Sequence, residues 1–389
     1  MNRNIETVRA GWKNRLPGWM QPFLTWVIGF PYEGQQPSLG KKPWYLPMMV
    51  AMAFLLAGMG LAQVIVSRGG MTWLAMPVAW MMVVSGARTL QVQIGHQGVH
   101  NQLSGNGLAD RIVVELASTL AGAQDFDGYK ADHVGIHHPK LATSVDPDRI
   151  FTMEVMNIRP GIAKATNKRR FVRSLFSPRI HAIFVIGRLR ANLLTSPPYR
   201  RIMAAIWFAI IAASIYASEN RVGMMVGWLC PLVILYQVSA MCQFVTEHFW
   251  TRQRKPGESR KFHNGSLLLN RHLGDPLPAI VVKGLTWLLA WARWWFRLAF
   301  YHGPVRMTVL VGDLPVHGTH HIWPLCHDWP NAIYSYHELS ERSGRGPIEV
   351  VGSFGSILDV VMASFEESEF TSSNVKMTLR GACEITNGM

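Results

Sequence analysis

Two long apolar runs, each interrupted by a three-residue polar break, dominate the pattern of the chain. The four resulting pieces have 17 to 25 residues each. A helix of about 20 apolar residues spans the hydrocarbon core of a bilayer and satisfies its own backbone hydrogen bonds there. The pattern therefore predicts an all-α integral membrane protein with four transmembrane helices in two hairpins. The predicted spans cover about residues 46–67, 71–87, 202–218 and 222–246.

The distribution of positive charge predicts which side of the membrane the rest of the chain occupies. The two breaks contain one cation each, Arg68 and Arg221, so 36 of the 38 Lys and Arg residues lie on the other side of the predicted hairpins. The positive-inside rule makes that side cytosolic. Both termini are then expected in the cytosol. This asymmetry accounts for the net charge of +14 without a nucleic-acid partner.

The spans divide the chain into three predicted parts. Residues 1–45 are expected to form a cytosolic and interfacial segment, residues 46–340 the membrane domain, and residues 341–389 a C-terminal tail whose sequence indicates little. Aromatic residues beside cations are typical of helices that lie at the headgroup level. A fifth span within Leu277–Ala292, where Lys283 interrupts the apolar pattern, stays open. The stretches expected at the interface are Trp19–Phe30, Ile180–Leu194 and Leu277–Tyr301.

Eight of the 15 histidines gather in three short clusters. On an α-helix, residues three or four apart share a face, so His96/His100, His133/His137 and His317/His321 are each expected to aim two rings at one point. The adjacent histidine in the second and third clusters is offset by about 100° and is expected to reach a second metal. The three clusters are His96 and His100; His133, His137 and His138; and His317, His320 and His321.

Eight imidazoles exceed the needs of one octahedral metal and approximate those of two. Imidazole suits iron, zinc, copper and nickel. The four cysteines, Cys383 among them, form no CxxC pair, and none lies within a histidine cluster, which disfavours a structural zinc site. No Glu-x-x-His pair of a carboxylate-bridged helical bundle is present. Ligating histidines usually donate their second N–H to a carboxylate or carbonyl, and the candidates for that role are Asp132, Asp146, Asp148 and Asp313, with His272 as a further possible neighbour of the site.

The order HxxxH, HxxxHH, HxxHH around two apolar hairpins resembles the membrane fatty acid desaturase superfamily. Two further motifs strengthen the resemblance: Asp146-Pro147-Asp148 follows the second cluster, and Ile322-Trp323-Pro324 continues the third. The similarity covers roughly residues 45–340. It implies two Fe²⁺ ions held by eight or nine histidines.

The ninth histidine of that family lies at the cytosolic end of the last span, which is the position of His248 here. Some members place an asparagine four residues earlier, where it holds a water at one iron. This chain has Phe244 at that position, so Gln243 or Glu247 substitutes for the asparagine or the position is unused. The expected metal ligands are His96, His100, His133, His137, His138, His248, His317, His320 and His321.

The resemblance implies an O2-dependent desaturase that introduces a double bond into a fatty acyl chain. The closest alternative is a hydroxylase or ketolase of a fatty acyl, alkane, sterol or carotenoid chain on the same scaffold. A non-enzymatic membrane metal-binding protein is a more distant alternative. The chain lacks a rubredoxin-type CxxC pair, a haem-binding HPGG motif and a GxGxxG motif, so electrons are expected from a separate ferredoxin-, rubredoxin- or cytochrome b5-like donor with its reductase.

Overall fold

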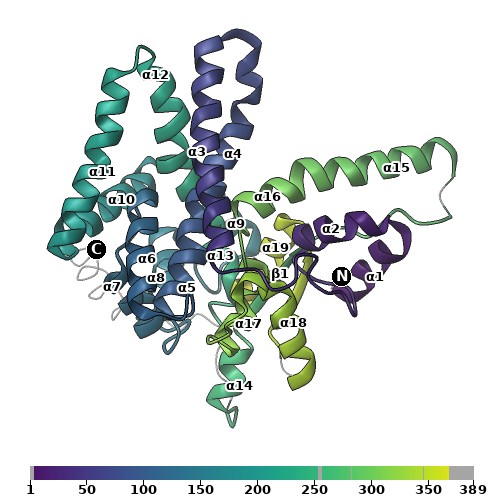
Figure 1. Ribbon diagram of the computed structural model, residues 1–389. Helices are drawn as coiled ribbons and strands as arrows, with labels where there is room; N and C mark the ends of the chain where they lie inside the picture. The colour runs from purple at the N-terminus through teal and green to yellow at the C-terminus, as the bar shows by residue number, and fades with distance from the viewer. Residues whose placement is uncertain (1–3, 253–255, 282, 345, 368–389) are drawn as a thin grey trace.

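A computed structural model describes residues 4–252, 256–281, 283–344 and 346–367 (Figure 1). Cys383 and the end of the predicted tail lie outside these residues. The described chain is mostly helical. Four of its helices are long and apolar enough to cross a membrane: Tyr45–Arg68, Gly70–Val99, Pro198–Ala217 and Arg221–Glu247.

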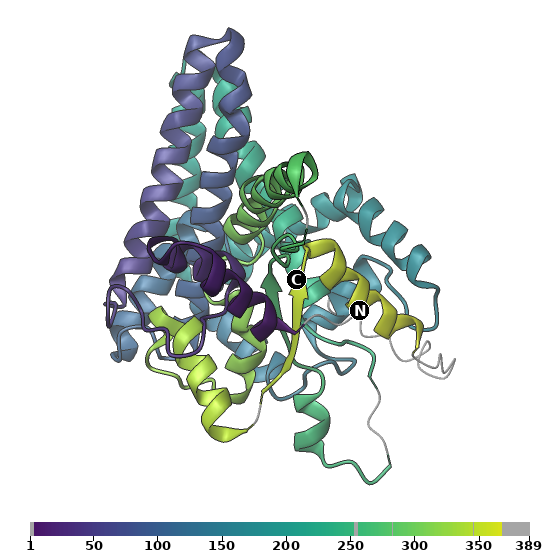
Figure 2. The same cartoon turned by 90° about the vertical axis from the view of Figure 1, so that its right-hand side faces the viewer.

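These four long helices stand at one end of the molecule, with the breaks that join them at the far tip (Figures 1 and 2). They agree with the predicted spans to within one residue at each end, except that the second extends 12 residues further, to Val99, and the third begins four residues earlier, at Pro198. The first and third are α3 (Tyr45–Arg68) and α11 (Pro198–Ala217). The second comprises η2 (Gly70–Ala75), α4 (Met76–Thr89), η3 (Leu90–Gly95) and α5 (His96–Val99), and the fourth comprises α12 (Arg221–Met224), η7 (Met225–Leu235) and α13 (Tyr236–Glu247).

Small residues allow α3 and α4 to approach closely. A Cβ on Gly58 would lie 2.8 Å from the backbone nitrogen of Val83, and one on Gly86 would lie 2.5 Å from the carbonyl oxygen of Ala51. Close helix packing over small residues is characteristic of helices in lipid, where van der Waals contact drives association. On α11, by contrast, large apolar side chains such as Ile202 and Ile206 are exposed.

Shorter helices pack around the opposite ends of the long helices, where the histidine clusters lie (Figure 1). Their main core joins α13 to α19 (Phe354–Glu366), through residues that include Val245 and Phe365. The other helices are α1 (Ile5–Arg15), η1 (Gly18–Met20), α2 (Gln21–Ile28), α6 (Gly107–Ala121), α7 (Phe126–Tyr129), η4 (Lys130–His137), α8 (Pro147–Ile150), η5 (Phe151–Val155), α9 (Lys164–Leu175), α10 (Pro178–Arg190), η6 (Ala191–Thr195), α14 (Arg260–Gly265), α15 (Gly284–Arg297), η8 (Leu298–His302), α16 (Gly303–Thr308), η9 (Leu314–Val316), α17 (His317–Ile322), η10 (Trp329–Asn331) and α18 (Ala332–Ser343).

A two-stranded parallel sheet corrects the expectation of an all-α fold. Strand β1 (Leu269–Leu273) pairs with β2 (Ile348–Gly352), with Arg271 opposite Val350. Strand β2 and the following α19 belong to the segment about which the sequence indicated little, and both contribute side chains to the main core. The sheet therefore fixes the described part of that segment beside the histidine-bearing α17, which also contacts β1.

Helix α15 runs across the direction of the four long helices (Figure 1). It continues without a break through η8 and α16, and this longer helix is not among those that are both long and apolar enough to cross a membrane. The possible fifth span within Leu277–Ala292 is therefore not found among the described residues. Trp294 on α15 is buried edge-on against Trp12 of α1, whereas Leu285 and Leu288 are exposed. This two-sided character fits the expected position at a membrane interface.

Candidate metal centre

The first two candidate ligands lie where the second long helix ends. His96 begins α5 and His100 follows it, and their ring centroids are 5.0 Å apart. Both side chains are buried. The expected pairing of His96 with His100 at i, i+4 is confirmed, because both rings belong to the same group of converging ligand atoms.

The second cluster departs from the expected geometry. Residues Lys130–His137 form a π-helix, in which the backbone N–H of His138 donates to the carbonyl of His133 at 3.0 Å. A π-helix hydrogen-bonds residues five apart, so it places positions 133 and 138 on one face. The Nε2 atoms of His133 and His138 accordingly lie 3.1 Å apart, and His137 turns to the other group. The predicted pairing of His133 with His137 is therefore wrong.

The third cluster matches its expected geometry. The Nε2 atoms of His317 and His321 lie 3.1 Å apart, while the Nε2 atom of His320 lies 3.1 Å from that of His100. Gly318 allows this placement, because a Cβ there would lie 2.9 Å from the backbone of Leu269 in β1. The adjacent histidine thus reaches the other group, as the 100° offset predicts.

His248 joins the candidate ligands from the end of the fourth long helix. Helix α13 ends at Glu247, and His248 takes an extended backbone that forms an isolated bridge with Leu268. Its fully buried ring lies 5.3 Å from the ring of His137 and 4.7 Å from that of His321, centroid to centroid. The structure therefore brings the proposed ninth ligand to the other eight.

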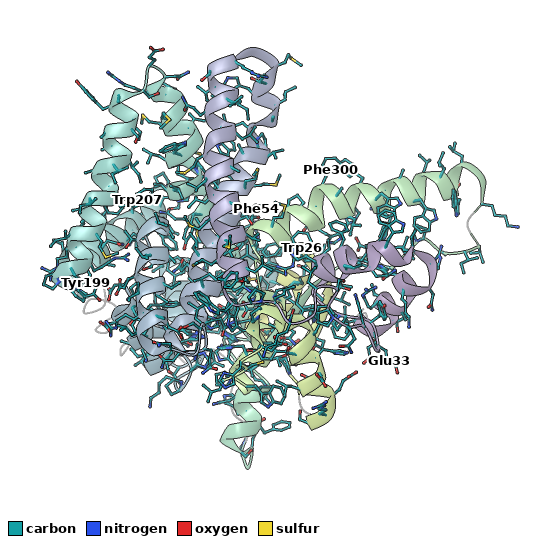
Figure 3. The ribbon with its side chains drawn as sticks, viewed as in Figure 1. Trp26, Glu33, Phe54, Tyr199, Trp207 and Phe300 are labelled. Atoms are coloured by element: carbon teal, nitrogen blue, oxygen red, sulfur yellow. The ribbon has the colours of Figure 1, made fainter. Side chains whose placement is uncertain are left out.

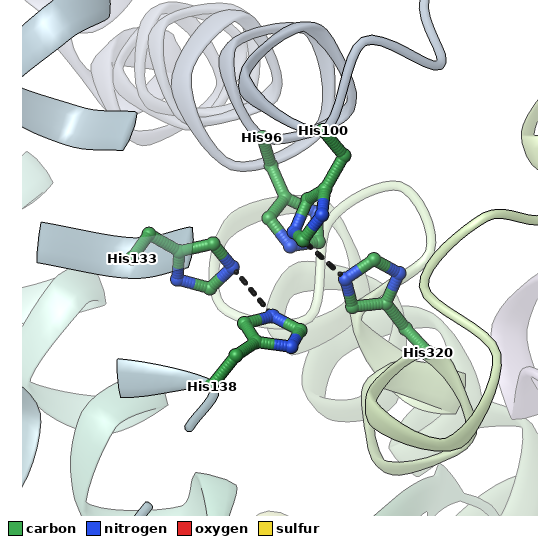
Figure 4. Close-up of side chains that lie close together, drawn as sticks. All are labelled: His96, His100, His133, His138 and His320. Atoms are coloured by element: carbon green, nitrogen blue, oxygen red, sulfur yellow. Dashed lines mark hydrogen bonds between the residues drawn. The ribbon is translucent and has the colours of Figure 1, made fainter. Parts of the chain in front are cut away.

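All nine predicted ligands converge in two adjacent groups. Each histidine offers one ring nitrogen as a ligand atom, and within each group all of these nitrogens lie within 4.8 Å of one another. Figure 4 shows the rings of the larger group pointing toward one another from three separate segments. The five-histidine group contains His96, His100, His133, His138 and His320, and the four-histidine group contains His137, His248, His317 and His321.

Burial keeps most of these rings neutral. It lowers the pKa of His133, His317, His320 and His321 well below 6.5, and neighbouring imidazoles lower it further. The pKa of His138 falls to about 2 for the same reasons. A histidine binds a metal through a neutral nitrogen, so an uncharged ring needs no deprotonation before ligation.

The unpaired nitrogen atoms fit a metal ion. Both ring nitrogens of His96 and of His248, and Nε2 of His137, are buried without a hydrogen-bond partner among the described residues. A buried polar atom without a partner costs about 1–3 kcal/mol. Ligation would satisfy these atoms, and the donor set suits iron, zinc, copper or nickel.

Two ligand rings have polar neighbours at Nδ1 that fix their orientation. The Nδ1 atom of His137 lies 2.9 Å from Oδ1 of Asp146 and 3.6 Å from Oδ2 of Asp148. Burial lowers the pKa of His137, but the two carboxylates and the hydrogen bond to Asp146 outweigh it and raise the pKa to about 9. The Nδ1 atom of His320 lies 3.1 Å from the hydroxyl of Tyr336, a neighbour that no sequence pattern indicated.

The other predicted neighbours have different partners. Asp132 accepts a hydrogen bond from Gln124, and Asp313 accepts one from Gln97. His272 lies in β1, where Nδ1 is 3.2 Å from the carbonyl of Ile28 and Nε2 is 2.5 Å from Glu349. His272 therefore links β1 to its surroundings and lies outside both histidine groups.

A cavity of about 380 Å³ lies beside the long helices. Apolar side chains line much of it, including Trp26 of α2 and Phe54 of α3, which are labelled in Figure 3. Its lining also includes Gln93 and Asp313. Asp313 accepts a hydrogen bond from Gln97, the residue that follows His96. This part of the cavity wall therefore lies next to the five-histidine group.

The chain shows no match to models of known protein families and none to curated proteins.

Proposed function

We propose that this protein is an integral-membrane, O2-dependent desaturase that introduces a double bond into a fatty acyl chain. The observation that carries the proposal is the convergence of nine histidines, seven of them buried and two partly buried, into two adjacent groups. These groups would hold two Fe²⁺ ions, one in each. The same arrangement in a metal-storage protein would not require a largely apolar cavity beside the site.

When bound, two ferrous ions would supply the chemistry that removes two hydrogens from adjacent carbons, using one O2, two electrons and two protons and forming two waters. The chain's own residues have simpler tasks. The buried imidazoles hold fixed positions, Asp146 and Tyr336 orient two of the rings, and the apolar cavity is suited to an alkyl chain. The exclusion of water protects such a reaction from side products.

The proposed topology has both hairpins crossing the membrane, with both termini and the metal centre on the cytosolic side. The proposed electron donor is a separate ferredoxin-, rubredoxin- or cytochrome b5-like protein. Helix α9 carries exposed Arg169 and Arg173, a charge that suits an acidic carrier. If the carrier binds to this basic surface, it should reduce the protein more slowly at higher salt, because salt screens the attraction.

The test is lipid profiling by mass spectrometry of cells with and without the protein. A desaturase removes two hydrogens from an acyl chain, whereas the hydroxylase alternative adds one oxygen. The His320→Ala variant is expected to lose turnover and bound metal, while His327→Ala, at an exposed residue outside both groups, keeps both. If the lipids of cells with and without the wild-type protein are the same, although the protein holds two irons and a competent donor is present, the proposed activity is refuted.

A further inference from the structure

The carboxylates near the candidate centre are distributed unevenly. Asp146 and Asp148 lie against His137, and Oε1 of Glu247 lies 3.2 Å from Nε2 of His317. Both histidines belong to the four-histidine group. Among the described residues, no carboxylate forms a hydrogen bond or ion pair with a ring of the five-histidine group. The smaller group therefore has fewer imidazoles and more negative charge.

The position of Glu247 matches that of a ligand rather than of an orienting neighbour. Asp146 contacts His137 through Nδ1 and leaves Nε2 to face the group, whereas Glu247 contacts the Nε2 atom of His317. That nitrogen also lies 3.1 Å from Nε2 of His321. Two adjacent ligand atoms on an octahedral metal with bonds of about 2.1 Å are about 3 Å apart. Both separations are close to that value.

Neighbouring side chains hold the Glu247 carboxylate in place. Gln243, one helical turn earlier, donates to Oε1 at 3.0 Å, and Arg88 donates in turn to the amide oxygen of Gln243. Arg271 lies 3.8 Å from the same Oε1. Glu247 is 2% exposed. A buried carboxylate fixed in this way can meet a metal with little loss of conformational freedom.

We propose that Glu247 is a ligand of the metal in the four-histidine group, which makes the two sites chemically unequal: five imidazoles in one, four imidazoles and a carboxylate in the other. This inference rests on the proposed function only in assuming that each group holds a metal. Of the two residues that the sequence left open as substitutes for the water-holding asparagine, it selects Glu247 and makes its carboxylate a direct ligand. A carboxylate also offsets the buried charge of a divalent ion, which neutral imidazoles cannot do.

The test compares Glu247→Gln with Glu115→Gln in full-length purified protein. Glu115 is also a buried helical glutamate paired with an arginine, Arg200 at 3.3 Å, but it contacts no histidine. Metal affinity is measured by titration with Co²⁺ against a competing chelator. We expect two binding events in the wild type and in Glu115→Gln. In Glu247→Gln we expect at least a tenfold weaker affinity at one site and no change at the other.

Mössbauer spectra of ⁵⁷Fe-loaded protein provide a second readout that does not depend on turnover. The wild type should show two distinct iron environments, and only one of them should change in Glu247→Gln. Unchanged affinities and spectra in a folded Glu247→Gln protein would overturn the inference, and so would an equal loss at both sites. A wild type with two unequal irons but no desaturated product would refute the proposed function and leave the role of Glu247 intact.

Discussion

Each imidazole has two ring nitrogens, and the use of one decides what the other can do. Asp146 occupies Nδ1 of His137, and the hydroxyl of Tyr336 lies against Nδ1 of His320. In both rings Nε2 is left to face the candidate metals. Such a neighbour fixes the tautomer and the ring orientation and raises the basicity of the ligand.

The Asp146→Asn variant should bind metal about 10 to 100 times more weakly, the usual cost of losing such a neighbour. Asparagine retains much of the shape of aspartate and can still cap α8, whose Asp148 N–H donates to the Asp146 side chain. Because Oδ2 of Asp146 also accepts a hydrogen bond from the backbone N–H of Ala142, thermal unfolding of the metal-free variant shows separately how much of the effect falls on the fold. Metal content after dialysis against a weak chelator measures the loss of metal affinity.

Asp132→Asn is the matched control, because Asp132 contacts Gln124 and lies against no ligand ring in the described structure. Its metal content should equal that of the wild type. Equal metal retention by the Asp146 and Asp132 variants would contradict the role assigned to Asp146.

Eight ligand candidates could be predicted from their spacing and His248 from the family resemblance, but their division between the two groups could not be predicted. The partner of His133 depends on a π-helix, and the spacing alone favours the α-helical pairing with His137. Tyr336 lies 16 residues after His320 and carries no motif. Glu247 stood beside His248 in the sequence, yet only the folded chain places its carboxylate at His317.

At the scale of helices, the candidate ligands depend on local departures from α-helical geometry. Segments η3 and η4 are π-helices that lie directly before His96 and that contain His133 and His137. π-Helical turns occur often at functional sites because they redirect side chains without ending a helix. Here they turn the rings of two separate segments toward one another.

The contact between α3 and α4 gives a prediction of its own. Gly58→Ala should destabilise the protein by about 1–3 kcal/mol, the usual cost of overpacking, because its Cβ would lie 2.8 Å from the Val83 backbone nitrogen. Gly60→Ala, two residues away in the same helix, meets no atom within 4 Å and should be neutral or slightly stabilising. Thermal unfolding in detergent measures both, and equal midpoints would refute this packing account.

The long helices could be predicted from the sequence because length and hydropathy define them almost alone. The sheet could not. The central residues of β1 are Asn270, Arg271 and His272, and all three are buried, so the strand shows neither apolar alternation nor an apolar run. Its stability depends on specific partners, such as the carbonyl of Leu314 that accepts a hydrogen bond from Arg271.

For the molecule as a whole, metal binding should stabilise the fold by joining distant segments. A ligand that binds only the folded chain adds about 2.7 kcal/mol when its free concentration is 100 times Kd. Removal of metal with a chelator should therefore lower the midpoint of thermal unfolding, and added Fe²⁺ under anaerobic conditions should restore it. The His320→Ala variant should respond less. An identical midpoint with and without metal would contradict this linkage.

The proposed topology predicts opposite accessibility for two exposed residues. Glu219 lies in the break between the third and fourth long helices, and Glu33 lies before the first. In a variant without the native cysteines, a membrane-impermeant maleimide should label Glu219→Cys from outside intact cells. It should label Glu33→Cys only in inverted vesicles. Labelling of both from the same side would refute the two-hairpin arrangement.

The grouping of the histidines also sets an order for assembly during synthesis. Four members of the five-histidine group have left the ribosome once residue 138 has emerged, whereas the four-histidine group receives two of its members only at positions 317 and 321. The first pocket can capture an ion while most of the polypeptide is still to be made. The second must wait until the final fifth of the chain is made, so a chain that ended before residue 317 would hold at most a single metal.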